Sequence, residues 1–256
     1  GLRKYYAKAK AVIINVDNNS PDGTKEVFEQ TKTLNPKLYV STKKGITGKG
    51  YNFYNLFKKA REFKAKVVIV VDADLQSISP EWVCELGEPI TKKNYDFVTP
   101  IYARHEYDGS ITNHIVYPLV YGLLGYNIRQ PIGGDFAMSG KLVDYLLKQK
   151  WIKTTKKYGI DVFLTLNAVL GGFKIAQTNL GAKIHKPSAP KLGPMFSQVS
   201  ITLFSKLVEH RSAWQRPIRA RRVPVFYQKR GAKPQDLSID YKAIKATALY
   251  LFSINR

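Results

Sequence analysis

A run of apolar residues that ends in two carboxylates constrains the fold of this chain more than any other feature. Val67–Val71 is β-branched throughout and is followed directly by Asp72, Ala73 and Asp74. Such a run is typical of a buried strand of a parallel sheet, whose two faces are both covered. Its carboxyl end would place the carboxylates at the edge where open α/β sheets bind ligands, including divalent cations. Asp is also common at strand ends for turn chemistry, so a purely structural interpretation stands beside the functional one.

The composition predicts one soluble globular protein. The chain has 256 residues, of which 44% are hydrophobic, enough for one sizeable core. The longest apolar run away from the strands, 115–125, contains Pro118 and is shorter than the roughly 20 residues that cross a bilayer. We also expect no signal peptide at Gly1. The single Cys84 excludes an internal disulfide framework, and we expect a cytoplasmic protein.

The charge balance predicts anionic partners. Lys and Arg number 41 against 19 Asp and Glu, a net charge of +22 that would concentrate polyanions near the surface. Phosphorylated small molecules, anionic lipid surfaces and nucleic acid are all partners of this kind. The densest basic stretch, Arg211–Arg222, carries five arginines together with Trp214. We interpret it as a solvated or phosphate-attracting segment, with nucleic-acid binding as the alternative.

Strands and helices alternate along the first hundred residues. We predict strands at 11–16, 38–41, 67–71 and 97–99, and helices at 1–10, 24–31, 52–63 and from residue 80. This βαβαβ order with short connections predicts an α/β fold with a doubly wound, mostly parallel sheet. The second half is less regular, with helices predicted at 111–124, 140–148, 159–170, 195–214 and 239–252, and strands at 136–139 and 174–178.

Several motifs occur in an order that resembles one enzyme family. They are residues 16–24, 48–50, 72–74, 130–135, 158–161, 179–181 followed by His185, and 192–195 followed by 198–199. Together they resemble the nucleotide-binding half of GT-A glycosyltransferases and, downstream, the retaining glucosyl-3-phosphoglycerate synthase and mannosylglycerate synthase group. The resemblance spans roughly residues 11–200. It implies a Rossmann-like GT-A fold with a less regular, acceptor-side C-terminal half.

The resemblance also implies a domain organisation. Residues 1–215 would form the catalytic domain, and 216–256 a basic linker and C-terminal helix that packs on it or takes part in oligomerisation. Such enzymes open with a strand and a loop that holds the nucleotide base. Here residues 1–10 match the helix after that strand, so we expect the chain to begin inside the fold.

A donor site for a UDP- or GDP-linked sugar is implied at the carboxyl ends of the strands. Asp17 and Asn18 would contact the base or ribose, with an Asx turn as the structural alternative. Lys49 lies between two glycines ahead of a helix, where an ammonium group and a helix N-terminus attract a diphosphate and glycine lets the backbone approach a ligand; a flexible basic loop is the alternative. The remaining predicted donor-binding residues are Asp72, Ala73, Gly133, Gly134, Asp135 and Tyr158.

The glycine pair and the carboxylate after it have a particular expected role. Gly133 and Gly134 would let the backbone come close to the sugar, and Asp135 would accept hydrogen bonds from its hydroxyls. The alternative is a plain turn into the strand at 136–139.

A divalent-cation site is implied at Asp74 and His185. In the resembled enzymes the matching histidine joins the second carboxylate of the Asp-x-Asp motif as a metal ligand. Mixed nitrogen and oxygen ligation suits Mn²⁺ at least as well as Mg²⁺. The cation would offset the diphosphate charge as the sugar bond breaks. We expect the other histidines to be surface or packing residues; they are His105, His114 and His210.

The resemblance assigns the catalytic role to Asp161. The matching residue lies near the reacting hydroxyl, where it could orient the hydroxyl or take its proton. A first-turn carboxylate that stabilises the helix dipole is the alternative. Because the pattern places no second carboxylate as a covalent nucleophile, it implies front-face transfer with retention of configuration.

The acceptor site departs from the family pattern. In the phosphoglycerate-using enzymes a Gly-Arg-x-Thr stretch binds the acceptor phosphate, whereas here the arginine is replaced by Ser110 and an expected asparagine by Pro187. Positive charge could come instead from Arg104, Lys186 or Lys191. The predicted acceptor-binding residues are Arg104, Thr112, Lys186 and Met195.

The sequence therefore predicts a metal-dependent glycosyltransferase that moves a sugar from a nucleoside diphosphate to a small hydroxy-acid or phosphorylated acceptor, such as glycerate or phosphoglycerate. The alternatives are an inverting enzyme acting on a polyprenyl phosphate or polysaccharide, and a basic nucleic-acid-binding protein. Peripheral membrane contact and a homodimer are compatible with the sequence.

Overall fold

The computed structural model describes the chain except for residues 106–107, 186–190, 229–231, 235, 237–241, 243–244, 247–248, 251–252 and 254–256. Lys186, Pro187 and most of the helix expected at 239–252 therefore lie outside the described residues.

The strands form two sheets. β1 (Ile13–Asp17) and β2 (Lys37–Ser41) make a small parallel sheet. The larger sheet has the order β3-β5-β4-β6-β7 and consists of β3 (Val67–Val70), β5 (Phe136–Ser139), β4 (Phe97–Ala103), β6 (Ile175–Ala182) and β7 (Val225–Phe226). Among the described strands, β5 runs antiparallel to both of its neighbours, β3 and β4, while β4, β6 and β7 pair in parallel. The mixed α/β architecture with mostly parallel strands agrees with the sequence, but a single continuous sheet does not form.

The strand ahead of the two carboxylates differs from its prediction. Val67–Val70 is a strand, but its one partner among the described residues is the antiparallel β5, with Val68 opposite Met138. Val68 is its one buried residue, and Val71 beyond its end is exposed. The expectation of a buried parallel strand was therefore wrong. A β-branched run reports strand propensity, whereas the direction of the neighbouring strand is set by the whole fold.

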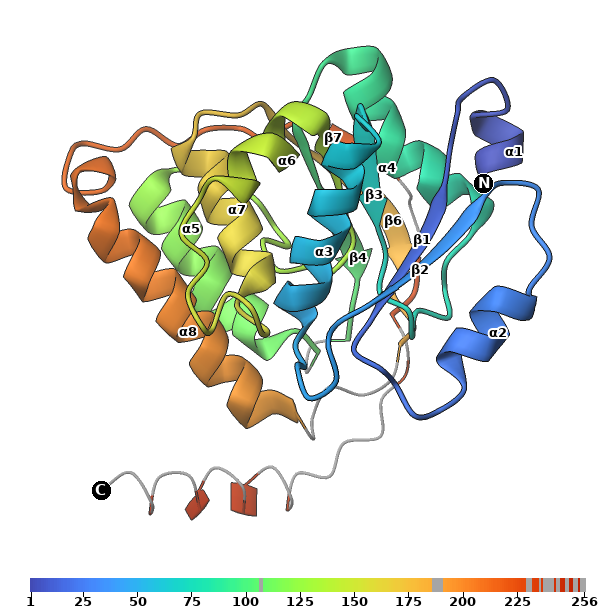
Figure 1. Ribbon diagram of the computed structural model, residues 1–256. Helices are drawn as coiled ribbons and strands as arrows, with labels where there is room; N and C mark the ends of the chain where they lie inside the picture. The colour runs from blue at the N-terminus through green and yellow to red at the C-terminus, as the bar shows by residue number, and fades with distance from the viewer. Residues whose placement is uncertain are drawn as a thin grey trace.

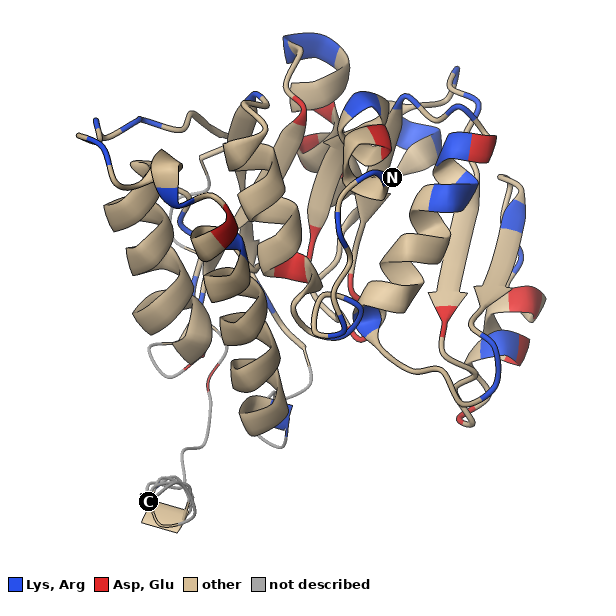
Figure 2. Ribbon diagram, turned by 60° about the vertical axis from the view of Figure 1, so that its left-hand side comes forward, with Lys and Arg blue, Asp and Glu red and all other residues tan. Residues whose placement is uncertain are grey.

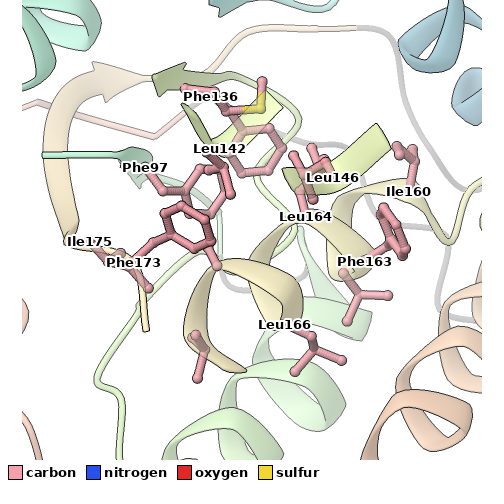
Figure 3. Packing of buried hydrophobic residues seen from close by; sticks show 14 of the residues in the cluster. Phe97, Phe136, Leu142, Leu146, Ile160, Phe163, Leu164, Leu166, Phe173 and Ile175 are labelled. Atoms are coloured by element: carbon pink, nitrogen blue, oxygen red, sulfur yellow. The ribbon is translucent and has the colours of Figure 1, made fainter. Parts of the chain in front are cut away.

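Helices cover both faces of the larger sheet (Figure 1). On β4, Phe97 packs into the main core with Phe136 and Leu142, while Val98 points to the other face and packs with Trp82 and its neighbours. This division follows from the two-residue period of a strand. The first face carries α3 (Lys49–Glu62), α6 (Gly140–Leu147) and α7 (Ile160–Leu170), and the second carries α4 (Pro80–Lys93). Figure 3 shows the phenylalanines and leucines that fill the first layer.

The remaining helices are α1 (Leu2–Tyr5), α2 (Thr24–Gln30), α5 (Tyr117–Leu124) and α8 (Leu192–Glu209). Helix α1 is much shorter than the helix expected at residues 1–10. The helix expected at 111–124 opens with a π-helical turn at Thr112–Val116, next to Pro118, which cannot donate a backbone hydrogen bond. α8 starts and ends earlier than predicted and is followed by a short 3₁₀ turn. Among the described residues no helix is long and apolar enough to span a membrane.

The segment after α8 packs back onto the body of the fold. Arg221 forms a parallel bridge with Tyr126, and Val225–Phe226 adds β7 to the edge of β6. The sequence did not predict this strand, because two residues are too few to show an alternating pattern. The first part of the expected linker is thus fixed to the larger sheet.

Candidate active site

Three predicted residues from distant parts of the chain meet at the carboxyl end of β3. The ammonium group of Lys49 lies 2.9 Å from Asp72 Oδ1 and 3.2 Å from Asp161 Oδ2. Lys49 is the first residue of α3, Asp72 follows β3, and Asp161 is the second residue of α7. The structure therefore brings together a predicted diphosphate-binding lysine, the first carboxylate of the Asp-x-Asp motif and the predicted catalytic carboxylate.

The glycines around Lys49 pack closely against another segment of the protein, and their expected approach to a ligand stays a prediction. A Cβ at Gly48 would lie 2.4 Å from the carbonyl oxygen of Lys156, and a Cβ at Gly50 would lie 2.0 Å from that of Thr155. The Gly50 amide donates to the Lys157 carbonyl at 3.1 Å. The missing side chains thus admit another segment of the protein, the loop that leads to α7. They fix the start of α3 beside that loop, which sets the distance between Lys49 and Asp161.

A second lysine, Lys183, completes the cluster, and the sequence analysis missed it. Its ammonium group lies 2.8 Å from Asp135 Oδ2, 3.4 Å from Asp72 Oδ2 and 2.9 Å from the Gly133 carbonyl oxygen. The Lys183 side chain is only 4% exposed. One signal was present: Lys183 precedes His185 by two residues, so on an extended chain both project to the same side.

Asp135 is fully buried and serves as an internal anchor. Its Oδ1 accepts the Asp72 backbone N–H at 2.9 Å, and its Oδ2 accepts from Lys183 and from the Tyr102 hydroxyl. Burial, followed by the Asp135 charge, raises the pKa of Tyr102 well above its usual range and keeps that hydroxyl a donor. Asp135 thus holds the loop that carries the Asp-x-Asp motif, and its predicted contact with the sugar stays a prediction.

Gly134 fits closely against the motif. Its backbone has φ of +87°, and a Cβ there would lie 2.2 Å from Asp72 Oδ2. Gly133 in turn packs against Pro100, where a Cβ would lie 2.4 Å from the ring. These close contacts require glycine at both positions and seat Asp72 against β5.

The charges of the cluster shift each other's pKa. Burial lowers the pKa of Lys49, but the carboxylates of Asp161 and Asp72 outweigh it and raise that pKa above its ordinary value. Burial raises the pKa of Asp72, but Lys49 and Lys183 outweigh it and hold the pKa below its usual range. For Asp161, burial dominates over Lys49, and its pKa is raised. The site therefore contains one firmly ionised carboxylate and one that binds a proton more readily.

Asp161 also retains free bonding capacity. Its side chain is 12% exposed, its Oδ2 faces Lys49, and its Oδ1 is buried without a hydrogen-bond partner among the described residues. An unpaired buried acceptor is costly in a folded protein. A hydroxyl group of a bound molecule would satisfy it, which is the arrangement required of a group that orients a hydroxyl or takes its proton.

His185 lies in a second polar cluster with Arg104 and Asp108. Arg104 Nε is 2.8 Å from Asp108 Oδ2, and His185 Nε2 is 3.6 Å from the same oxygen. The guanidinium also reaches His185 Nε2 at 3.5 Å and donates to Gln130 Oε1 at 3.2 Å. Burial raises the pKa of Asp108, but His185 and Arg104 outweigh burial and lower that pKa below its usual value. Asp108 is not among the residues predicted from the sequence, because no motif contains it. Arg104, predicted to bind the acceptor, here holds the predicted metal-ligating histidine.

The loops that carry Asp74 and His185 are joined. The Gln76 backbone N–H donates to the Ile184 carbonyl at 2.9 Å, and the Ile184 N–H donates to Ser77 Oγ at 3.0 Å. Asp74 is exposed two residues before this contact. Within the described residues no group of three or more His, Cys, Asp and Glu is arranged to hold a metal ion. A carboxylate and an imidazole fit Mn²⁺ or Mg²⁺ as a partial donor set, with phosphate oxygens and water as further ligands.

Asp17 and Asn18 form contacts within the protein. Asp17 Oδ2 accepts from the Ser20 N–H at 2.8 Å and from the Tyr39 hydroxyl at 2.6 Å. Asn18 Oδ1 accepts the Gly48 N–H at 3.1 Å, which ties the end of β1 to the start of α3. The turn closure expected as the structural alternative is therefore present for Asp17. Contact of these residues with a nucleotide stays a prediction.

The other predicted residues lie apart from these contacts. Ala73 is exposed between the two carboxylates, and Thr112 is buried at the start of the π-helical turn. The Tyr158 N–H donates to Gln198 on α8, and Met195 packs against the main core. The predicted roles of these four residues stay predictions.

Comparison with known proteins gives a consistent result. A search of curated protein sequences finds no match. Among solved structures, the chain is similar to glucosyl-3-phosphoglycerate synthase of Mycobacterium tuberculosis in complex with Mn²⁺, UDP-glucose and phosphoglyceric acid, with 21% identity, a TM-score of 0.55 and coverage of 78% of this chain and 80% of that one. It is equally similar to the same enzyme with Mg²⁺ and UDP, with 22% identity, a TM-score of 0.56 and the same coverage.

These matches confirm the GT-A fold expected from the motifs. The family model for glycosyl transferase family 2 matches residues 3–145, more than half of the chain. The prediction of a nucleotide-sugar-dependent glycosyltransferase is thereby confirmed, and the chain belongs to glycosyl transferase family 2.

Proposed function

We propose that this glycosyltransferase moves a hexose from a UDP- or GDP-linked sugar to a hydroxyl group of a small anionic acceptor, with retention of configuration. The observation that carries the proposal is the sharing of Lys49 between Asp72 and Asp161, which puts a diphosphate-attracting ammonium group beside a carboxylate that has a free oxygen. The similar M. tuberculosis structures contain UDP-glucose and phosphoglyceric acid, which supports the substrate class. A cytoplasmic location is part of the proposal.

The donor diphosphate would lie at the N-terminus of α3, where Lys49 and the helix dipole both favour negative charge. Asp74 and His185 would hold a divalent cation there, which supplies Lewis-acid stabilisation of the leaving group. Mn²⁺ and Mg²⁺ both occur in the similar structures. Arg104 and Asp108 would keep the His185 ring oriented.

Asp161 would orient the acceptor hydroxyl and receive its proton. Its raised pKa makes it a better base than an exposed carboxylate, and a hydroxyl that reached this carboxylate would give the buried Oδ1 a hydrogen-bond donor, which it lacks among the described residues. The carboxylates of Asp72 and Asp135 are both engaged by lysines. This engagement favours front-face transfer, with retention, over a covalent intermediate on a second carboxylate.

Thermal-shift measurements with UDP-, GDP- and ADP-sugars, each with and without Mn²⁺, test the donor and the cation. We expect Mn²⁺ with one nucleotide sugar to raise the melting temperature, and Asp74→Ala to abolish that gain. The exposed carboxylate of Asp144 on α6 provides the matched control, since Asp144→Ala should keep the gain. No response to any nucleotide, together with steeply salt-dependent binding of nucleic acid, would instead favour the basic nucleic-acid-binding alternative.

Product analysis tests the chemistry. With glycerate and phosphoglycerate as acceptors, Asp161→Asn should keep the donor-induced shift and lower the transfer rate on the order of 10²–10⁴-fold. NMR of the product gives its anomeric configuration. An inverted product, or transfer only to a polyprenyl phosphate, would replace this proposal by the inverting alternative.

A further inference from the structure

Helix α8 leaves a face of large apolar side chains in solvent. The exposed fractions are 48% for Phe196, 51% for Ile201, 50% for Phe204 and 69% for Val208. Ile201, Phe204 and Val208 follow the i, i+3, i+7 spacing of one helix face, whereas Phe196 is exposed near the N-terminus outside that spacing. An outer helix face in contact with water alone would carry charged side chains. A contiguous apolar face of this kind marks an interaction site.

Charged side chains are almost absent from this helix. Between residues 192 and 208 the sequence has one charged residue, Lys206, whose side chain is 5% exposed. Figure 2 shows α8 as a largely tan ribbon, with blue at its start and with blue and red in its last turn. The helix is therefore apolar on its inner side, where it packs on α7, and uncharged on its outer side up to Glu209.

A basic segment is fixed beside the end of this helix. All five of its arginines are exposed; they are Arg211, Arg216, Arg219, Arg221 and Arg222. The Trp214 indole N–H donates to the Leu207 carbonyl at 2.8 Å, and the Arg221 guanidinium donates to the Tyr126 hydroxyl at 2.9 Å. From residue 191 to 228 Glu209 is the single acidic residue. The apolar face of α8 is thus followed in the chain by an exposed basic segment that is tied to the end of the helix at Leu207, and together they are the α8 surface.

We propose that this surface docks the enzyme on an anionic lipid membrane, with α8 lying in the interface. An apolar helix face next to exposed cations is the pattern of a helix that lies in the headgroup region, where burial of apolar area and attraction to anionic lipids add. A second copy of the chain is a weaker occupant, because it would bring another net charge of +22 to the same surface. The proposal is independent of the donor and acceptor.

Co-sedimentation of the whole protein with vesicles tests the docking. We expect binding to vesicles of phosphatidylcholine with phosphatidylserine, weaker binding to phosphatidylcholine alone, and a loss of binding as salt is raised. Phe204→Ser combined with Val208→Ser should weaken binding at least tenfold. Arg216→Gln combined with Arg219→Gln should weaken it on the order of 25-fold, since each surface arginine contributes about fivefold.

Matched variants keep the test specific. Val27→Ser with Leu34→Ser removes apolar residues that are 65% and 79% exposed elsewhere, and Lys43→Gln with Lys44→Gln removes two exposed charges of the loop before α3. Both should bind vesicles as the wild type does, and circular dichroism verifies that every variant folds.

Three results would overturn the proposal. The first is a wild type that does not bind anionic vesicles at low salt. The second is binding that survives the loss of Phe204 and Val208, which would reduce the contact to general electrostatics. The third is a dimer in light scattering that the same variant dissociates, without vesicle binding, which would assign the face to a second copy.

Discussion

Replacement of Lys183 by methionine would test the internal charge cluster most directly. Lys183 is the buried cation that joins Asp135 to Asp72, at 2.8 and 3.4 Å. Methionine has nearly the same length and no charge, so the variant removes the ion pairs with little change in packing. We expect a large loss of stability, because Asp135 is completely buried and cannot turn to water.

The magnitude follows from what remains after the substitution. Removal of one partner of a buried ion pair costs about 3–5 kcal/mol, because it leaves the other charge uncompensated. Asp135 would keep two hydrogen bonds, from the Tyr102 hydroxyl and the Asp72 backbone N–H, and Asp72 would keep Lys49. These contacts place the expected loss near the lower limit, at about 3 kcal/mol.

Urea unfolding followed by circular dichroism at pH 7 measures this loss. The midpoint should fall while the slope with denaturant stays constant. Asp135→Asn completes a double-mutant cycle with Lys183→Met. The double variant should lose about 1–3 kcal/mol less free energy of unfolding than the sum of the losses of the two single variants, because the two side chains interact directly.

The pH dependence supplies a second check. Lys183 helps to hold the pKa of Asp72 below its usual range. The resulting contribution to the free energy of unfolding is present above the unfolded pKa of about 4 and is lost as pH falls through the pKa of Asp72 in the folded protein. The stability difference between wild type and Lys183→Met should narrow in that acidic range. A loss below about 1 kcal/mol at pH 7, or additive effects in the cycle, would refute the assignment of a buried ion-pair cluster.

Further predictions concern the glycine beside the motif, the proposed catalytic carboxylate and the turn after β1. Gly134→Ala should destabilise the protein more than Gly172→Ala in urea unfolding, because both glycines have positive φ but only a Cβ at Gly134 meets another atom within 4 Å; equal losses would contradict the close contact. Asp161→Asn should raise the melting temperature, by more at pH 7 than at pH 4, because a raised folded pKa means that stability is lost as pH rises through it; an unchanged melting temperature would argue against burial of the charge. The hydrogen bond to Asp17 raises the pKa of Tyr39 to about 12. In ¹³C-tyrosine NMR the resonance missing from Tyr39→Phe should therefore titrate with a midpoint near pH 12, and Asp17→Asn should return that midpoint toward 10.

The local elements of this fold could be predicted from the sequence because they depend on periodicity and end signals. The strand at 136–139 agrees with its prediction, and most other elements agree to within a few residues. The direction of pairing could not be predicted. β5 runs antiparallel between β3 and β4, and its four residues carry no pattern that distinguishes an antiparallel central strand from a parallel one.

The candidate site was predictable where residue types stand out in their local context. Lys49 between glycines, Asp72 after an apolar run and Asp161 at a helix start all had such a context, and the structure brings them together. Lys183 had little such context, because lysine is almost always a surface residue. The burial of Lys183 is stabilised by carboxylates that lie far away in the sequence. Asp108 likewise acquires its role from Arg104 and His185 in space.

The role of Lys49 connects the two halves of the proposed reaction. Its charge is shared by Asp72 and Asp161, and for Asp161 that charge is the main influence opposing the rise in pKa caused by burial. A diphosphate at the start of α3 would draw the ammonium group toward its own negative charge, because phosphate oxygens compete with carboxylates for the same donors. Asp161 would then lose part of its compensation, and its affinity for a proton would increase. Binding of the donor would thus prepare the carboxylate to accept the proton of the attacking hydroxyl, which explains why one lysine bridges these two residues.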